Sequence, residues 1–349
     1  MNDLMKRFEM KLPLILAPMG GGPSTPALAA AVCNAGGLGS LGCAYLSPEL
    51  MTQEIQKTRE LTKRPFVVNL FVPAEEPVLD EMSLHRALKA TKIYRDELEL
   101  EKPDFKPPYA ENFDAQFEAM LREKPAAFSF VFGSLDRKYL EACQREGIYT
   151  MGTATTLDEA LLLQEAGVEA VIAQGVEAGG HRAIFDAKKE DPQIGVLPLV
   201  SLLKDHIRVP IIAAGAIMNG KGIKAAVDLG AQAAQLGTAF LLCEEAGTNK
   251  AYRLFLLDTQ QRTTHLTRAF SGRIARGIEN RFMMEMKDKE SAILPFPAQN
   301  AFTRDIRGKA AQMRRPEFLS MWAGEGVAQI RTMKAAELVQ MLAAEYAEA

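Results

Sequence analysis

Short apolar runs recur along the chain and alternate with longer stretches in which apolar and polar residues are mixed. In the runs, which are four to six residues long, apolar residues follow one another with little alternation. Runs of this kind are typical of strands buried on both faces, as in parallel sheets covered by helices. Eight strands are predicted: Leu14–Ala17, Leu38–Leu41, Phe66–Leu70, Ala127–Phe132, Ile148–Met151, Ala170–Ala173, Pro210–Ala214 and Ala233–Leu236.

The mixed stretches between these runs predict helices. One of them is preceded by Thr156 with Glu159 three residues later, which predicts a capping box. Strands that alternate with helices indicate an α/β fold, and eight of them favour a (β/α)8 TIM barrel. A doubly wound open sheet is the alternative. The predicted helices are Pro26–Ala35, Pro48–Thr62, Asp136–Glu146, Leu157–Ala166, Pro198–Asp205, Gly220–Leu229 and Lys334–Glu348.

Two parts of the chain do not follow the alternation. Residues 73–124 are charged, dotted with prolines and helical in pattern, and they are too long for an ordinary connection between a strand and a helix. The segment from Ala239 to Ala349 is helical in pattern. We therefore expect a barrel over 1–238 with an excursion at 73–124, a smaller helical substrate-side domain over 239–315, and C-terminal helices over 316–349 that pack back on the barrel.

Composition narrows the class of protein. The chain has 349 residues, of which 48% are hydrophobic and 24% charged, and its net charge is -3. These values are ordinary for a globular protein and argue against nucleic acid or a membrane as partner. The four cysteines are scattered singly, and the first apolar run is too short for a signal sequence. A cytoplasmic protein is expected.

The most informative stretch is the loop that follows the sixth predicted strand. It holds Gln174, Glu177, three glycines and His181. In parallel α/β folds ligands bind at the carboxyl ends of the strands, where this loop begins. His181 is the candidate acid or base because imidazole titrates near neutrality. The alternative is a structural histidine in a tight turn. The other histidines, at positions 85, 206 and 265, lie in less suitable places.

Other strand ends carry groups suited to a phosphate-bearing ligand. In barrels, phosphate is commonly bound by the loops after the seventh and eighth strands, which here contain Gly215 and the run Gln235, Leu236, Gly237 and Thr238. The amides of Asn69 and Gln174 could read the edge of a flavin, although buried amides also serve as structural bridges. No pattern of metal ligands, P-loop or nucleophile elbow is present. The GxGxxG spacing from Gly37 follows a helix rather than a strand, so it does not predict a dinucleotide site.

Taken together, several strings make the sequence resemble the nitronate monooxygenase family, formerly called 2-nitropropane dioxygenases, in its class I bacterial branch. The match runs in order over nearly the whole chain, and GVEAGGHR is its most specific part. The strings lie at Ala17–Gly21, Asn69–Phe71, Gln174–Arg182, Ala213–Gly215, Gln235–Phe240 and Trp322–Gly324. Two positions depart from the family pattern: Ala183 stands where glycine is expected, and Glu325 where glutamine often occurs.

The resemblance implies a barrel that binds FMN without a covalent bond, with His181 as the catalytic residue. It implies oxidation of nitronates, such as propionate 3-nitronate or alkyl nitronates, by O2 through a flavin semiquinone to a carbonyl compound and nitrite. The partners would be a small nitronate or nitroalkane and O2, and the protein a monomer or homodimer. The implied cofactor-binding residues are Met19, Gly20, Asn69, Gln174, Gly179, Gly180, Gly215, Gln235, Leu236, Gly237 and Thr238.

Two other functions remain open. The first is an NAD(P)H-dependent flavin reductase of the enoyl-acyl-carrier-protein or quinone type, which shares the phosphate loops and the Gly-Gly-His string. The second is a flavin- or phosphate-binding module without catalysis.

Overall fold

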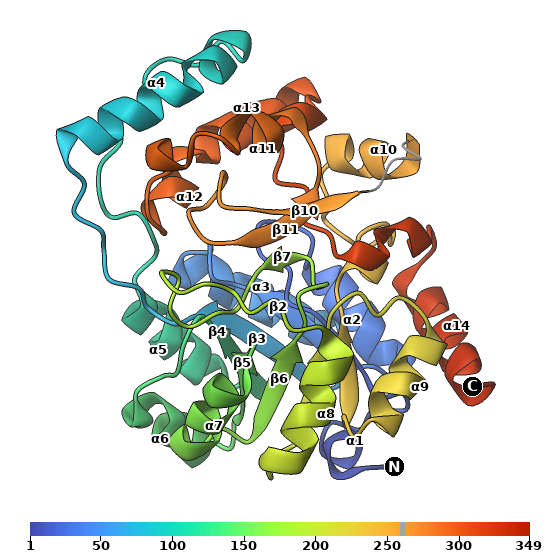
Figure 1. Ribbon diagram of the computed structural model, residues 1–349. Helices are drawn as coiled ribbons and strands as arrows, with labels where there is room; N and C mark the ends of the chain where they lie inside the picture. Colours follow the sequence, from blue (N-terminus) through green and yellow to red (C-terminus); the bar gives the residue numbers. More distant parts are fainter. Residues whose placement is uncertain (259–262) are drawn as a thin grey trace.

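The computed structural model describes residues 1–258 and 263–349. Its centre is an eight-stranded parallel sheet in the order β1-β9-β8-β6-β5-β4-β3-β2 (Figure 1). A parallel bridge from Ile15 to Leu38 joins the two edge strands, which nearly closes the sheet. The predicted TIM barrel is confirmed, and the open sheet is excluded. The strands are β1 (Leu14–Leu16), β2 (Gly39–Gly42), β3 (Phe66–Phe71), β4 (Ala127–Val131), β5 (Tyr149–Ala154), β6 (Ala170–Gln174), β8 (Ile211–Ala214) and β9 (Ala233–Leu236).

Helices surround this sheet. The last of them, α14 (Ala335–Ala347), packs against both α9 and α2 and so occupies the eighth position of the ring. Thr156 caps α7 as predicted, but the Glu159 carboxylate accepts hydrogen bonds from Thr155 instead of completing a capping box. The other barrel helices are α2 (Pro26–Ala35), α3 (Pro48–Leu61), α5 (Phe113–Glu123), α6 (Arg137–Arg145), α7 (Leu157–Ala166), α8 (Val196–His206) and α9 (Gly220–Asp228).

The predicted excursion is shorter than its pattern indicated. Helix α5, which lies within it, packs on α3 and is the barrel helix between β3 and β4. Helix α4 (Glu81–Glu97) leaves the barrel and lies beside the C-terminal region (Figure 1). There Arg95 forms an ion pair with Asp305 at 2.6 Å, and Glu97 pairs with Arg281 at 2.8 Å.

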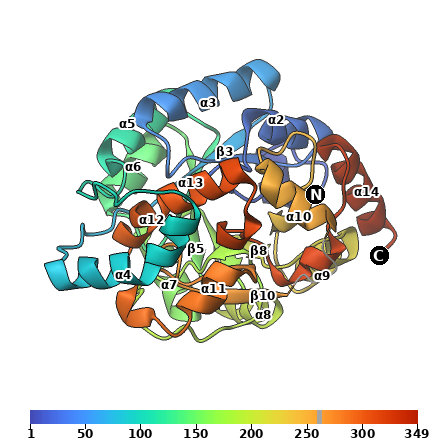
Figure 2. The same ribbon diagram turned by 90° about the horizontal axis from the view of Figure 1, so that it is seen from above.

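The region after β9 lies across one end of the barrel (Figure 2). It is mainly helical, as predicted, but it also contains two strands that the sequence did not predict: β10 (Thr264–Thr267) and β11 (Ala275–Ile278) form an antiparallel hairpin that pairs with β7 (Gly180–His181). Its helices are α10 (Lys250–Asp258), α11 (Arg281–Met286), α12 (Ala298–Phe302) and α13 (Arg304–Met313), with short 3-10 turns η1 (Thr238–Phe240), η2 (Glu290–Ala292), η3 (Pro316–Phe318) and η4 (Glu325–Gln329).

The barrel interior is filled by an apolar cluster with a central layer of one residue from each strand position, closed from below by helix α1 (Asp3–Arg7); Tyr149, Ala170 and Ala214 belong to the same cluster. Because side chains alternate along a strand, every second residue points into the barrel. The layer comprises Ile15, Leu38, Val67, Ala127, Met151, Ile172, Ile212 and Ala233, with Leu4, Phe8 and Met10 beneath them. The residues that follow these by two positions form the upper face of the barrel, where the C-terminal region lies.

In the described residues, no helix combines the length and the apolar character needed to cross a membrane.

Candidate active site

The upper face of the barrel is uncharged and polar. Asn69 on β3 is 5% exposed, and its Nδ2 donates to Ser129 Oγ on β4 at 2.9 Å. Its Oδ1 accepts no hydrogen bond from the described residues. Gln235 on β9 has the same interior orientation, and its amide has no hydrogen-bond partner in the described part of the chain. These two predicted residues therefore lie in one layer with unused hydrogen-bonding groups.

Gln174, the third predicted amide, bridges parts of the protein. Its Nε2 donates to the backbone oxygen of His181 at 3.0 Å, and its Oε1 accepts from the backbone N–H of Ala183 at 2.9 Å. Arg182 Nη1 donates to the same Oε1 at 2.9 Å. The Gln174 amide therefore acts as a structural bridge, which is the alternative given above: it holds the loop that presents His181, and its second N–H has no partner among the described residues.

The two predicted phosphate loops lie next to η4. Gly215 has φ of +152° and Ala216 has φ of 49°, so the turn after β8 uses backbone conformations that side chains disfavour. After β9, Thr238 Oγ1 accepts a hydrogen bond from the backbone N–H of Gly324 at 2.9 Å. Glu177, close to Gly215, accepts from the backbone N–H of Val196 at the start of α8. The loop after β9 thus contacts the Trp322–Gly324 string, and the loop after β8 lies beside Gly326, where a Cβ would be 2.8 Å from Ala216 O.

Close backbone approaches occur at Gly42, beside the predicted Gly20, and at the predicted Gly179. A Cβ on Gly42 would lie 2.6 Å from the backbone N of Gly20, and a Cβ on Gly179 would lie 2.5 Å from Ala323 C. Real Cβ atoms do not approach so closely, so these two positions require glycine. Gly180 has φ of +78° and begins β7. Met19 lies near Gly237 and packs against both the barrel core and the C-terminal core.

His181 lies above this face, held by the pairing of β7 with β11. Its Nε2 lies 2.8 Å from Ser271 Oγ. Burial, together with the charges of Arg273 and Arg307, lowers the pKa of His181 from 6.5 to about 3, so the imidazole is neutral near pH 7. Four aromatic rings lie with centroids 5.6–6.3 Å from the imidazole: Phe71, Phe132, Phe296 and Trp322.

Two guanidinium groups beside His181 have no carboxylate within ion-pair distance among the described residues. Arg273 is 7% exposed and lies over the Phe132 ring, 4.1 Å from its centroid. Arg307 on α13 donates to Asn300 Oδ1 at 2.9 Å and to backbone oxygens. Burial lowers the pKa of each to about 10, which leaves both charged near pH 7. Arg273 is buried and Arg307 is half-buried, and a desolvated cation without a carboxylate partner is costly, so this geometry favours an anionic ligand.

Tyr45 lies on the barrel side of the same group of residues. A Cβ on Gly20 would lie 3.4 Å from its ring, which also meets Phe71 edge-on with centroids 5.3 Å apart. Burial raises the pKa of Tyr45 to about 12, against the opposing charges of Arg307 and Arg304. The phenol therefore stays protonated and can donate a hydrogen bond.

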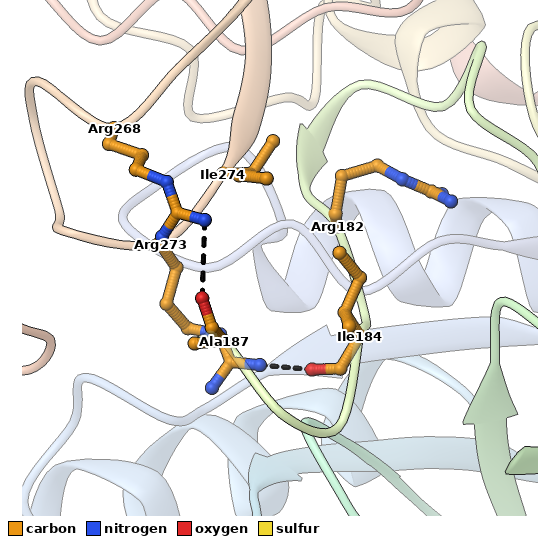
Figure 3. A pocket seen from close by; sticks show the side chains of 6 residues that line it. All are labelled: Arg182, Ile184, Ala187, Arg268, Arg273 and Ile274. Carbon is orange, nitrogen blue, oxygen red and sulfur yellow. Dashed lines mark hydrogen bonds between the residues drawn. The ribbon is translucent and has the colours of Figure 1, made fainter. Parts of the chain in front are cut away.

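Behind His181, the loop over 182–195 is fixed by many polar contacts. Arg182 is fully buried, and its Nε donates to Asp191 Oδ2 at 2.6 Å. Arg268 and Arg273 donate to the backbone oxygens of Ala187 and Ile184 around a small pocket (Figure 3).

The two departures from the family pattern lie in different surroundings. Ala183, the first, is fully buried in the loop over 182–195. Glu325, the second, forms an ion pair with Arg276 at 3.0 Å.

Comparison with known proteins agrees with this geometry. The family model described as nitronate monooxygenase matches residues 2–345. This chain belongs to the nitronate monooxygenase family. A Bacillus subtilis (strain 168) protein named as a probable nitronate monooxygenase is 38% identical over 333 residues, which cover 94% of this chain and 93% of the relative.

Solved structures resemble this member of the family over its full length. The nitroalkane oxidase from Streptomyces ansochromogenes superposes with a TM-score of 0.93 at 39% identity, covering 99% of this chain and 98% of that one. FabK from Thermotoga maritima superposes with a TM-score of 0.75 at 25% identity, covering 100% and 96% of the two chains.

Sequence reasoning missed the residues that the C-terminal region brings to His181. Ser271, Arg273 and Arg307 lie about 90 or more positions from His181, and no motif links them to it. The strings FSGR and RDIRG that contain them gave no local signal of a binding site. The pairing of β7 with β11, which the sequence did not predict, brings the turn with Ser271 and Arg273 to His181, and α13 carries Arg307.

Proposed function

We propose that this protein oxidises nitronates with O2 to a carbonyl compound and nitrite, using FMN. The observation that carries the proposal is the position of His181: a neutral imidazole among aromatic rings and two unpaired guanidinium groups, above an uncharged polar barrel face. Membership of the nitronate monooxygenase family and the likeness to a nitroalkane oxidase support the same reaction class.

The residues at the barrel end fit FMN. Asn69 Oδ1 and the Gln235 amide are unused polar groups at a largely buried face, suited to the hydrogen-bonding edge of a flavin ring. The turns at Gly215 and at Gly237–Thr238 would hold the phosphate, while Met19 and Gly20 would flank the ring. Gln174, Gly179 and Gly180 would shape the loop beside it, and Leu236 would bring its backbone close. When bound, FMN supplies the electron-accepting chemistry that side chains lack.

The chain's own residues would bind and orient the substrate. Arg273 and Arg307 would attract an anion, such as an alkyl nitronate or the doubly charged propionate 3-nitronate. The rings of Phe71, Phe132 and Phe296 would exclude water, which strengthens those electrostatic contacts. For a neutral nitroalkane, a free imidazole nitrogen of His181 would take the proton from carbon, whose electron pair remains to form the nitronate.

The alternative is an NAD(P)H-dependent flavin reductase, of the enoyl-acyl-carrier-protein or quinone type. The likeness to FabK makes this the function to exclude. An absorption spectrum of the purified protein with flavin bands is expected, followed by nitrite release from a nitronate in air. Rapid anaerobic bleaching by NADH without nitrite release would support the reductase, and a folded colourless protein that takes up no FMN would contradict both.

We also propose a cytoplasmic monomer or homodimer. Sedimentation of the purified protein and fractionation of the source cells test these two points.

A further inference from the structure

The contact between His181 and Ser271 joins two distant parts of the chain. Ser271 is 1% exposed and lies in the turn between β10 and β11. Its Oγ is 2.8 Å from His181 Nε2. In the described residues, the other ring nitrogen, Nδ1, makes no hydrogen bond. The two nitrogens of the imidazole are therefore in different environments.

The hydrogen bonds of Ser271 determine which group is the donor. Its Oγ lies 3.2 Å from the backbone oxygen of Arg273, and this oxygen accepts from no other group in the described residues. A hydroxyl has one hydrogen, and donating it satisfies this otherwise unpaired carbonyl. The backbone N–H of Arg273 also points at Oγ, at 3.4 Å. Ser271 Oγ is then an acceptor toward His181, so the ring hydrogen lies on Nε2.

We propose that Ser271 is a positioning residue that fixes the Nε2–H tautomer of His181 and leaves Nδ1 as the proton acceptor. Its catalytic consequence rests on the function proposed above. When Nδ1 takes a proton from the carbon of a nitroalkane, the imidazolium keeps its Nε2–H bond to Ser271, and the electron pair of the broken C–H bond stays on the substrate. A preformed nitronate needs no such transfer.

The turn that carries Ser271 is anchored independently of His181. Thr303 Oγ1 donates to the backbone oxygen of Phe270 at 2.6 Å, and the backbone N–H of Ser271 donates to Arg268 O. Gly272 has φ of +85°, and a Cβ on it would lie 2.5 Å from Leu294 O. The hydroxyl of Ser271 is thus held in place by the surrounding chain, as an orienting group must be.

The first test is long-range 1H–15N NMR of the holoprotein labelled with 15N-histidine. The His181 signals are assigned by their loss in His181→Asn. At pH 7 the wild type is expected to show a neutral ring with the hydrogen on Nε2, and Ser271→Ala a mixture of tautomers or the Nδ1–H form. A wild-type ring protonated on Nδ1, or an unchanged ring in Ser271→Ala, would overturn the proposal.

The second test is kinetic and compares nitroethane with its preformed nitronate. Ser271→Ala is expected to lose roughly 10-fold or more in kcat/KM on nitroethane, and less than about 3-fold on the nitronate. Thr303→Val is the matched control, because it loosens the same turn but does not touch His181. Equal losses on both substrates, or the same pattern in Thr303→Val, would reduce Ser271 to a structural role.

The two tests separate this inference from the proposed function. The tautomer is measured without turnover. An Nε2–H ring that depends on Ser271, in a protein that releases no nitrite from either substrate, would support the positioning role and contradict the proposed reaction.

Discussion

The two surfaces that meet at His181 differ in chemistry and in origin. The barrel face offers amides, hydroxyls and backbone N–H groups and carries no charge. The region across it offers two guanidinium groups, a serine and aromatic rings, from elements far along the chain. A neutral polar face suits a large planar cofactor, and a cationic apolar face suits a small anion. The difference suggests that cofactor binding and substrate choice can be altered separately.

The variant His181→Asn tests most directly whether cofactor binding and turnover can be separated, because it should leave the barrel face intact. We expect FMN binding to persist, while turnover of a neutral nitroalkane falls by at least an order of magnitude and roughly 10² to 10⁴-fold. Nitrite release and the flavin absorption spectrum measure the two effects. His206→Asn, at the exposed end of α8, is the control. Equal activity of His181→Asn and wild type on nitroethane would refute the base.

Removing one of the two guanidinium groups tests whether they bind an anionic substrate. Arg307→Gln is expected to raise KM for an anionic nitronate roughly 10-fold or more, because a hydrogen bond to a charged group contributes about 1.5–3 kcal/mol. The effect on a neutral nitroalkane should be smaller. Lys309→Gln removes a charge from the same helix, at a position that makes no ion pair with the described residues, and should change KM little. Similar KM shifts for both substrates would indicate loss of structure rather than loss of anion binding.

Two glycine substitutions test the close contact between β2 and the Gly20 loop on the barrel face. Gly42→Ala places a Cβ against the backbone of Gly20 and should destabilise the fold by about 1–3 kcal/mol and weaken FMN binding. Gly308→Ala, on α13, meets nothing within 4 Å and should stabilise the protein by up to about 1 kcal/mol. Denaturant unfolding with a fluorescence titration of FMN measures both. A neutral Gly42→Ala would mean that β2 and the Gly20 loop are not in contact.

The smallest expected effect concerns acid stability. The pKa of His181 is about 3 in the folded protein against an ordinary 6.5. Between these two pH values the imidazole binds a proton in the unfolded chain but not in the folded one. This stabilising contribution is present above pH 6.5 and is lost progressively as the pH falls toward 3. His181→Asn lacks the contribution, so its melting temperature should fall less between pH 7 and pH 5. A steeper fall in the variant would contradict the low pKa.

The barrel could be read from the sequence because its signals are local. Buried strands such as Ala170–Gln174 are largely continuous apolar runs; Gln174 is the last residue of its strand, and Asn69 lies two residues before the end of β3. The hairpin could not be read, because Thr264–Thr267 is partly exposed without alternation and Ala275–Ile278 is fully buried although it contains Arg276 and Gly277. The strand with which the hairpin pairs, β7, has only two residues, too few to give a pattern. Ser271 and Arg273 lie in the turn of that hairpin and were missed with it, and Arg307 on α13 had no local signal either.

Glu159 is a second case in which a contact with a distant part of the chain left no signal in the local sequence. Its spacing from Thr156 predicted a capping box, and Thr156 does cap α7. The carboxylate, however, accepts hydrogen bonds from Thr155 and from the backbone N–H of Phe185, in the loop after His181. A contact over 26 positions outweighed the local one, and the sequence carried no signal of it.

The position of α14 has a consequence for biosynthesis. Its residues Leu338, Val339 and Leu342 bury against the same core as the barrel strands and fill the space between α9 and α2. The ribosome makes this helix after every other helix of the ring and after the whole region that crosses the barrel end. In a nascent chain the apolar flanks of α2 and α9 therefore lack their partner until α14 has been made, so closure of the helix ring comes after synthesis of the elements that cross the barrel end.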